Sequence, residues 1–114
     1  MIRKELRWYP LFSTQQELED QFVRGETRIV KSTFGDVLLV KKRETFYAFE
    51  TRCPHQRKPL EGSWVENDKI VCPMHQYRFS LKDGRGHGMC LDRYPLRISN
   101  DGVFIGKERW VLGF

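Results

Sequence analysis

Two short segments constrain the folding of this chain more than any other part of its sequence. They read CPH at residues 53–55 and CPMH at residues 72–75, and sixteen residues separate His55 from Cys72. Each segment supplies one cysteine thiol and one imidazole, and a proline directly after each cysteine restrains the backbone. We therefore expect a fold in which two restrained loops, at the ends of neighbouring hairpins, converge on one site.

Short runs rich in β-forming residues surround these segments. The runs predict single strands at 28–31, 36–41, 45–50 and 77–81. They predict hairpins at 64–71, turning at Asn67 and Asp68, and at 96–105, turning at 99–102. Thr14 and Glu17 have the spacing of a capping box, which predicts one short N-terminal helix because Gly25 follows soon after. The apolar tail at 110–114 is expected to pack back as a further strand. The predicted fold class is all-β, an antiparallel sandwich or barrel.

Composition and hydropathy place the chain in the soluble class. Of its 114 residues, 39% are hydrophobic and 13% aromatic, which is enough for one domain with a core and excludes a disordered chain. The longest purely aliphatic run covers residues 37–40, so we expect no transmembrane helix and no membrane partner. The first residues are charged and lack the apolar stretch of a signal peptide. We therefore expect a cytoplasmic protein.

The charge and the cysteine count exclude two further classes. The net charge of +5 is spread along the chain without a block of five like charges, which favours a solvated basic surface. Acidic protein partners fit this charge better than a nucleic acid does, so no nucleic-acid partner is expected. Three cysteines are too few for a disulfide scaffold. Cys90 lies outside both segments and is expected to be a small buried residue.

The donor types within the two segments narrow the kind of site. Four donors could hold a structural zinc, but zinc fingers usually place two cysteines on one arm and two histidines on the other. Here each arm is mixed, with one cysteine and one histidine. Mixed arms are the pattern of a Rieske 2Fe–2S centre, in which two histidines replace two cysteines on one iron. Zinc, and a chance occurrence of the four residues, stay open as alternatives.

About 30% of the chain resembles the Rieske-type ferredoxins. The resemblance is carried by RCPH at 52–55, PLEG at 59–62 and DKIVCPMHQYRFSLKDG at 68–84. It implies a Rieske-like fold of three stacked antiparallel sheets. A small cluster-binding subdomain, at about 52–93, would sit on a base formed by residues 1–51 and 94–114.

The same resemblance assigns the cofactor and its ligands. It implies one 2Fe–2S cluster per chain, held at Cys53, His55, Cys72 and His75. The two cysteines would bind the buried iron, and the two histidines would bind the outer iron near the surface. In this assignment both irons are fully coordinated, so neither offers a position for substrate.

Several positions depart from the pattern of the family, and four of them lie in the two loops. Rieske proteins of the cytochrome bc complexes place a disulfide at the positions of Lys58 and Met74, so this chain lacks that brace. Many members have glycine at the positions of Arg57 and Gln76. A bulkier residue at either position is expected to alter how closely the backbone approaches the cluster.

These features predict an electron carrier rather than an enzyme. A Rieske oxygenase also needs a mononuclear iron held by two histidines and a carboxylate, but only His87 remains outside the two segments. The expected function is one-electron transfer from a reductase to a terminal enzyme, such as an aromatic-ring dioxygenase. A small subunit of a nitrite reductase and a redox-sensing binding module remain as alternatives.

The residues beside the two histidines predict how a redox partner docks. Three of the five are cationic and none is acidic: Gln56, Arg57, Lys58, Gln76 and Arg78. We therefore expect a positive rim around the electron port, and partners that present acidic docking faces.

Overall fold

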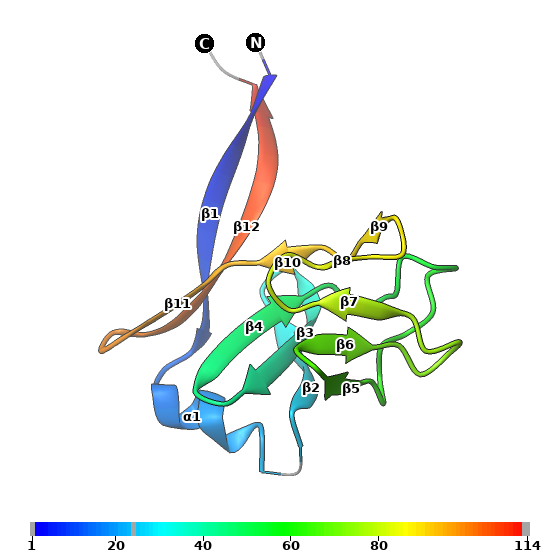
Figure 1. The fold of residues 1–114 in the computed structure, drawn as a ribbon. Coiled ribbons are helices and arrows are strands. Elements are labelled where there is room, and N and C mark those ends of the chain that lie inside the picture. The colour runs from blue at the N-terminus through cyan, green and yellow to red at the C-terminus, as the bar shows by residue number, and fades with distance from the viewer. Residues whose placement is uncertain (1, 24, 113–114) are drawn as a thin grey trace.

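A computed structural model describes residues 2–23 and 25–112 of the chain. Within these ranges one helix, α1 (Gln15–Asp20), accompanies twelve strands (Figure 1). The strands are β1 (Ile2–Phe12), β2 (Thr27–Ser32), β3 (Gly35–Lys42), β4 (Thr45–Phe49), β5 (Trp64–Glu66), β6 (Lys69–Val71), β7 (Arg78–Ser80), β8 (Arg85–Gly86), β9 (Met89–Cys90), β10 (Arg93–Tyr94), β11 (Leu96–Ser99) and β12 (Gly102–Leu112).

The strands form three main antiparallel sheets, which confirms the predicted all-β class. Their strand orders are β1-β12-β11, β10-β4-β3-β2 and β5-β6-β7, and β8 with β9 adds a two-stranded hairpin. The described residues contain no helix that is long and apolar enough to cross a membrane.

Local sequence signals account for the helix and for one of the tight turns. The hydroxyl of Thr14 accepts a hydrogen bond from the backbone N–H of Glu17 at 3.2 Å, which satisfies one free donor of the first helical turn. Between β5 and β6, Asn67 and Asp68 both have positive φ angles, 52° and 60°. Such angles are typical of a two-residue hairpin turn whose twist matches that of its strands.

The core consists of two apolar clusters that share strand β3. Because side chains alternate along a strand, Leu38 and Val40 point into one cluster, and Val37 and Leu39 into the other. The first cluster continues to the sheet β5-β6-β7 and includes both Cys53 and Cys72. The second lies between the β4 sheet, α1 and the β12 sheet. The two predicted segments are therefore attached to the first cluster.

Strand β1 and the outer half of β12 form a long two-stranded ribbon that leaves the body (Figure 1). The sequence did not lead us to expect a strand at 2–12. It predicted that the tail at 110–114 packs back, but Trp110 is 66% exposed at the outer end of the ribbon. The strand prediction for 110–112 is correct and the packing prediction is wrong. Residues 113–114 lie outside the described residues.

Candidate metal centre

The two predicted segments form loops with the same hydrogen-bond closure. In the first loop, residues 53–58, the backbone N–H of Cys53 donates to the carbonyl of Lys58 at 2.8 Å. In the second loop, residues 72–77, the backbone N–H of Cys72 donates to the carbonyl of Tyr77, also at 2.8 Å. Each cysteine is thus fixed at the base of a six-residue loop, and each histidine lies within the loop between the two hydrogen-bonded residues.

Each loop turns through two consecutive left-handed residues. These are Gln56 and Arg57 in the first loop, with φ of 62° and 55°, and His75 and Gln76 in the second, with φ of 66° and 56°. Arg57 and Gln76, four residues after their cysteines, occupy the positions where many Rieske proteins have glycine. The backbone keeps the conformation that glycine favours, at a cost of roughly 1–2 kcal/mol for each side chain placed there.

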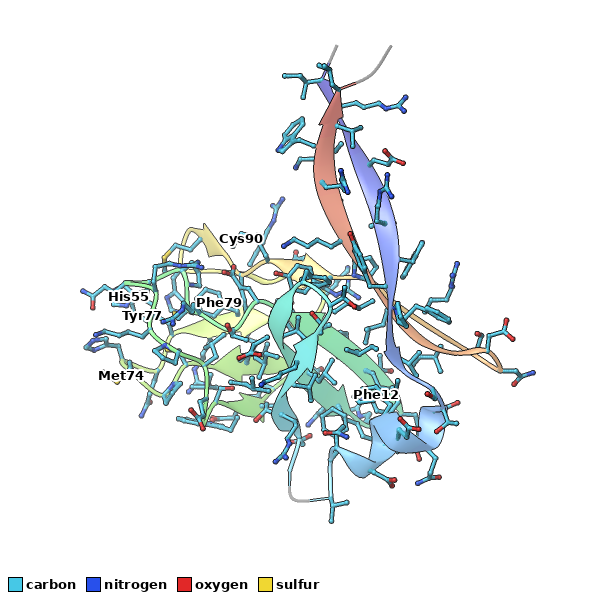
Figure 2. The ribbon with its side chains drawn as sticks, turned by 180° about the vertical axis from the view of Figure 1, so that it is seen from behind. Phe12, His55, Met74, Tyr77, Phe79 and Cys90 are labelled. Carbon is cyan, nitrogen blue, oxygen red and sulfur yellow. The ribbon has the colours of Figure 1, made fainter. Side chains whose placement is uncertain are left out.

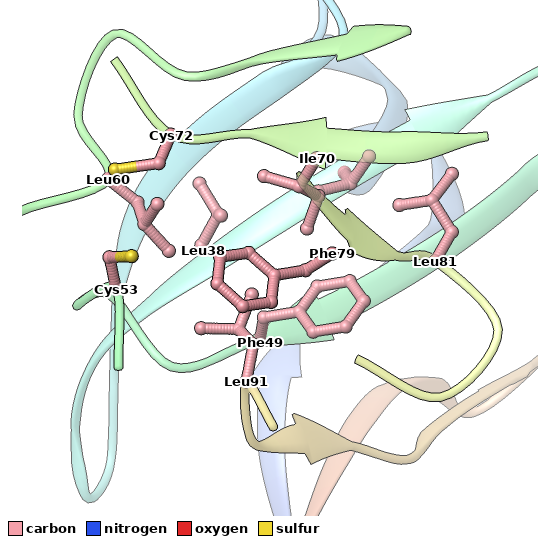
Figure 3. Packing of buried hydrophobic residues seen from close by; sticks show 10 residues of the cluster. Leu38, Phe49, Cys53, Leu60, Ile70, Cys72, Phe79, Leu81 and Leu91 are labelled. Atoms are coloured by element: carbon pink, nitrogen blue, oxygen red, sulfur yellow. The ribbon is translucent and has the colours of Figure 1, made fainter. Parts of the chain in front are cut away.

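The two cysteines lie side by side at one end of the first core cluster (Figure 3). Cys53 is fully buried and Cys72 is 1% exposed, with Leu60 packed beside them. Burial raises the pKa of the Cys53 thiol to about 11; a hydrogen bond from the backbone of His55 acts in the opposite direction, and the neighbouring Cys72 thiol adds to the increase. A metal that binds here must therefore displace a proton.

The two histidines are at the outer edge of the same loops. The ring centroids of His55 and His75 are 5.4 Å apart with an interplanar angle of 85°. His55 is half-buried and His75 is exposed. Figure 2 shows His55 and Met74 at the end of the body that lies away from the ribbon.

An aromatic stack supports His55 from the side of the body. The ring of Tyr77 lies 4.1 Å from the ring of His55 and 4.7 Å from that of His87, with which it is nearly parallel at 17°. His87 is fixed in turn, because its Nε2 accepts a hydrogen bond from the backbone N–H of Arg78 at 3.0 Å. His87 is therefore exposed, but its ring is held in place by Arg78 and Tyr77. The sequence did not predict these contacts.

Gly86 allows the β8-β9 hairpin to approach β7. A Cβ atom at Gly86 would collide with the carbonyl oxygen of Arg78. The hairpin carries His87 at its turn, so this close approach is what brings the His87 ring to Tyr77. A glycine is required at position 86 for lack of space rather than for a positive φ.

Glu50 anchors the first loop and is a residue that sequence reasoning missed. Its carboxylate accepts a hydrogen bond from the Arg57 guanidinium at 2.8 Å and another from the backbone N–H of Asp92 at 2.7 Å. The Glu50 side chain is only 11% exposed. The signal in the sequence was an acid at the end of the apolar run 45–50, but its two partners are known only from the structure.

The ion pairs change the predicted charge of the rim. Arg57 is paired with Glu50 at 2.8 Å, and Arg78 with Glu66 at 3.5 Å. Lys58 is exposed and forms no ion pair within the described residues. The positive charge available to a docking partner is therefore concentrated at Lys58.

Cys90 does not belong to this site. It lies in β9 and is exposed, so the prediction of a buried residue is wrong. The buried residue is its neighbour Leu91, which belongs to the first core cluster. In a two-residue strand, a shift of one position moves a side chain from the core to solvent.

The four predicted donors are therefore brought to one end of the body as two pairs. One pair is two buried thiols and the other is two imidazoles nearer the surface. Within the described residues no three His, Cys, Asp or Glu side chains gather as they would around a single ion. The arrangement fits a centre of two metals, with a soft thiolate pair on one and an imidazole pair on the other.

Known proteins resemble this chain in sequence and in fold. The ferredoxin component of the alkene monooxygenase system of Xanthobacter autotrophicus is 34% identical over 93 residues, which cover 78% of this chain and 76% of that protein. Apoptosis-inducing factor 3 of Homo sapiens is 27% identical over 92 residues, but the chain spans only 15% of its length.

A solved structure and a family model extend the comparison. The ferredoxin of carbazole 1,9a-dioxygenase from Nocardioides aromaticivorans IC177 superimposes with a TM-score of 0.64, covering 85% of this chain and 93% of that one at 18% identity, which shows the shared fold. The model of the Rieske [2Fe-2S] domain matches residues 7–94, a range that contains all four donors. The chain therefore belongs to the Rieske [2Fe-2S] domain family, and its cofactor is a Rieske-type 2Fe–2S cluster.

Proposed function

We propose that this chain carries single electrons from a reductase to a terminal oxygenase and catalyses no reaction on its own. The observation that carries the proposal is the asymmetry of the donor pairs: the thiols are buried, whereas the imidazoles lie at the edge of the molecule. A Rieske cluster supplies one-electron redox chemistry when bound. The loops expose one side of the site to a partner protein and shield the other.

The two pairs of residues have different proposed roles. Cys53 and Cys72 would hold the inner iron, because both lie in the apolar core where a neutralised thiolate pair is tolerated. His55 and His75 would hold the outer iron and form the exit for the electron. Tyr77 orients the His55 ring by contact at 4.1 Å between ring centroids.

We also propose the division of the chain into a cluster-binding subdomain, at about 52–93, and a base of residues 1–51 and 94–114. Supporting this, sheet β5-β6-β7 and hairpin β8-β9 lie within 52–93. The two parts share the first core cluster, since Leu38 and Phe49 of the base pack with Phe79 and Leu91 of the subdomain. We therefore expect the parts to unfold together.

The named relatives support a carrier for an oxygenase system, and we propose that this carrier works in the cytoplasm. One is the ferredoxin component of an alkene monooxygenase system, and the solved structure with the same fold is the ferredoxin of a carbazole dioxygenase. The redox partners of this chain would then be a reductase and an oxygenase. The exposed Lys58 at the rim favours partners with an acidic docking face.

The test uses the purified chain with its cluster. We expect about two irons and two acid-labile sulfides per chain, uptake of one electron, and the low average g value of a Rieske centre in electron paramagnetic resonance. The assay mixture contains NADH, the reductase of an oxygenase system and cytochrome c as the final acceptor. Adding the cluster-loaded chain should raise the rate of cytochrome c reduction in proportion to the concentration of the chain.

The matched control is the chain with its cluster removed by a chelator under reducing conditions. This apo chain should transfer no electrons in the same assay. A colourless protein with one zinc per chain, or a loaded chain that takes up an electron but leaves the cytochrome c rate unchanged, would contradict the proposal.

A further inference from the structure

The outer part of the ribbon has two chemically different faces. We call residues 2–6 of β1 and 108–112 of β12 the ribbon tip. Residues directly opposite each other in an antiparallel pair lie on the same face. One face of the tip carries the pairs Ile2–Leu112, Lys4–Trp110 and Leu6–Glu108, and we call it the outer face. The other face carries the pairs Arg3–Val111 and Glu5–Arg109.

The outer face points away from the body of the same chain. Side chains alternate between the two faces along each strand, so Tyr9 and its partner Ile105 lie on the face opposite the outer face. Ile105 is fully buried in the second core cluster. The apolar side chains of the tip are therefore on the side of the sheet that does not meet the core. The ribbon would not bury them by bending down onto its own body.

These side chains form one exposed apolar patch on the ribbon tip. Trp110 is 66% exposed, Ile2 67%, Leu112 64% and Leu6 44%. Together they leave roughly 400 Å² of apolar surface in water, within the range of patches that mark interaction sites. A two-stranded ribbon has no second layer of its own to cover such a patch.

The charges on the tip favour a partner with the same face. The outer face carries one cation, Lys4, and one acid, Glu108, at neighbouring levels of the ladder. It is therefore neutral and self-complementary. The opposite face carries two cations, Arg3 and Arg109, and one acid, Glu5, so an anionic surface would favour that face and leave the apolar patch uncovered.

We propose that the outer face of the ribbon tip binds the same face of a second copy of this chain. A two-fold axis along the ribbon places β1 of one copy over β12 of the other, with Ile2 over the partner's Leu112 and Lys4 near the partner's Glu108. Such an interface is isologous, so each contact is made twice. The pairing leaves both loop pairs free, because the tip and the loops are at opposite ends of the molecule (Figures 1 and 2).

The area available agrees with a dimer of moderate affinity. The four apolar side chains of two copies would bury about 800 Å², and the flanking Lys4, Trp8 and Glu108 bring the total toward the ~1,200 Å² at which specific interfaces begin. The family match covers residues 7–94, so the tip lies outside the part that it describes. The proposal rests on the ribbon alone and does not depend on the proposed electron transfer.

Sedimentation velocity of the cluster-loaded chain tests the proposal. Over a concentration range from roughly 1 μM to 1 mM, the mass should rise from 13.6 kDa to twice that value. Trp110→Glu should weaken the dimer at least tenfold. Val23→Glu is the matched control, because Val23 is an apolar residue 81% exposed on the turn after α1, and its dissociation constant should be unchanged.

Charge exchange identifies the partner as the same face. Lys4→Glu leaves two acids on the face, and Glu108→Lys leaves two cations, so each variant alone should self-associate more weakly. Mixed in equal amounts, the two variants should form a heterodimer, because every Lys4–Glu108 contact is then replaced by a complementary one. The visible absorbance of the cluster confirms that each variant is folded.

Three results would overturn the proposal. The chain could remain monomeric up to 1 mM. It could dimerise with equal affinity in the wild-type and Trp110→Glu forms. It could stay monomeric alone but lose binding to its reductase or oxygenase on Trp110→Glu, which would assign the outer face to a redox partner instead.

Discussion

The loop end and the ribbon tip of this protein handle exposed surface in opposite ways. At the loop end, backbone hydrogen bonds from Cys53 and Cys72 close both loops over a buried thiol pair, and most exposed side chains are polar, with Met74 as an apolar exception. At the ribbon tip, the strand ladder satisfies the backbone between β1 and β12, but apolar side chains such as Trp110 face the solvent. One end builds a site for a cofactor, and the other presents an apolar face to the solvent.

The difference shows what each end needs in order to be complete. The loops hold donors for metal, and binding of metal stabilises the folded state of such a site. At the ribbon tip, the ladder between β1 and β12 already pairs the backbone groups that face each other, and burial of the apolar face would add to its stability. Changes at the loop end should therefore alter the cofactor, whereas changes at the tip should alter association.

The largest expected effect is the loss of the cluster on Cys53→Ser or Cys72→Ser. Both thiols lie in the first core cluster and have no substitute nearby among the described residues. We expect iron and labile sulfide to fall to near zero and the loop end to lose protection in hydrogen exchange, whereas the ribbon keeps its protection. Cys90→Ser is the control and should retain full iron content, because Cys90 is exposed in β9. Iron loss in the Cys90 variant with retention in the Cys53 variant would reverse the ligand assignment.

Gly86→Ala should be the next most damaging change at the loop end. The added methyl group meets the carbonyl of Arg78, so β8 must move away from β7 and take His87 off the Tyr77 ring. We expect a loss of about 3 kcal/mol in the free energy of unfolding, measured by urea denaturation, together with a shifted resonance signal of the cluster. Gly25→Ala is the control, since nothing lies within 4 Å of a Cβ there. Equal effects of the two substitutions would mean that the close approach of β8 is not required.

Glu50→Ala should loosen the first loop without removing a ligand. It deletes the acceptor for the Arg57 guanidinium and for the backbone N–H of Asp92. The expected cost is about 2 kcal/mol in the free energy of unfolding, with faster loss of iron to a chelator. Glu26→Ala breaks only an exposed ion pair with Lys42 at 3.8 Å and should cost well under 1 kcal/mol. An unchanged rate of iron loss in Glu50→Ala would show that the loop is held by its backbone alone.

The smallest effect concerns the rate at which a redox partner associates. Lys58→Glu should slow second-order electron transfer to the oxygenase and flatten its dependence on salt, because Lys58 is the rim cation without an ion pair in the described part of the chain. Arg57→Glu would also place a second acid beside Glu50 and disturb the first loop, so a change in rate could not be assigned to docking alone. Arg109→Glu at the ribbon tip is the control, and stopped-flow rates for it should match the wild type. If reversal at Arg109 had the larger effect, the partner would dock at the ribbon.

The parts of the fold that the sequence predicted are those with local causes. The Thr14 cap, the turn at Asn67 and Asp68, and the β3-β4 hairpin each depend on neighbours a few residues apart. Strand β1 was not predicted, although Ile2, Leu6 and Trp8 alternate with charged residues. Its partner among the described residues is β12, about a hundred residues away in the sequence, and a pattern read over a few neighbouring residues cannot reveal such a pairing.

The site follows the same division. The convergence of the two segments was predicted because the motifs place potential metal-binding side chains at fixed short spacings, and their assignment as cluster ligands stays a prediction. The contacts that support these side chains were not predicted, because they join distant segments: Glu50 with Asp92, and Tyr77 with His87. The exposure of Cys90 was missed because in a strand of two residues the side that faces the core depends on the partner strand.

The pairing of Ile2 with Leu112 has a practical consequence for anyone who handles this molecule. A tag, a fluorophore or a fused enzyme attached next to Ile2 is attached at the same end of the ribbon as one attached next to Leu112. That place is the far end of the ribbon from His55 (Figure 2), and the His75 ring lies 5.4 Å from the His55 ring. A chain tethered to an electrode by one end would hold its histidines away from the metal surface, so direct voltammetry should be slow with either tether. An attachment at Lys58 would reverse the orientation and bring the electron exit to the electrode.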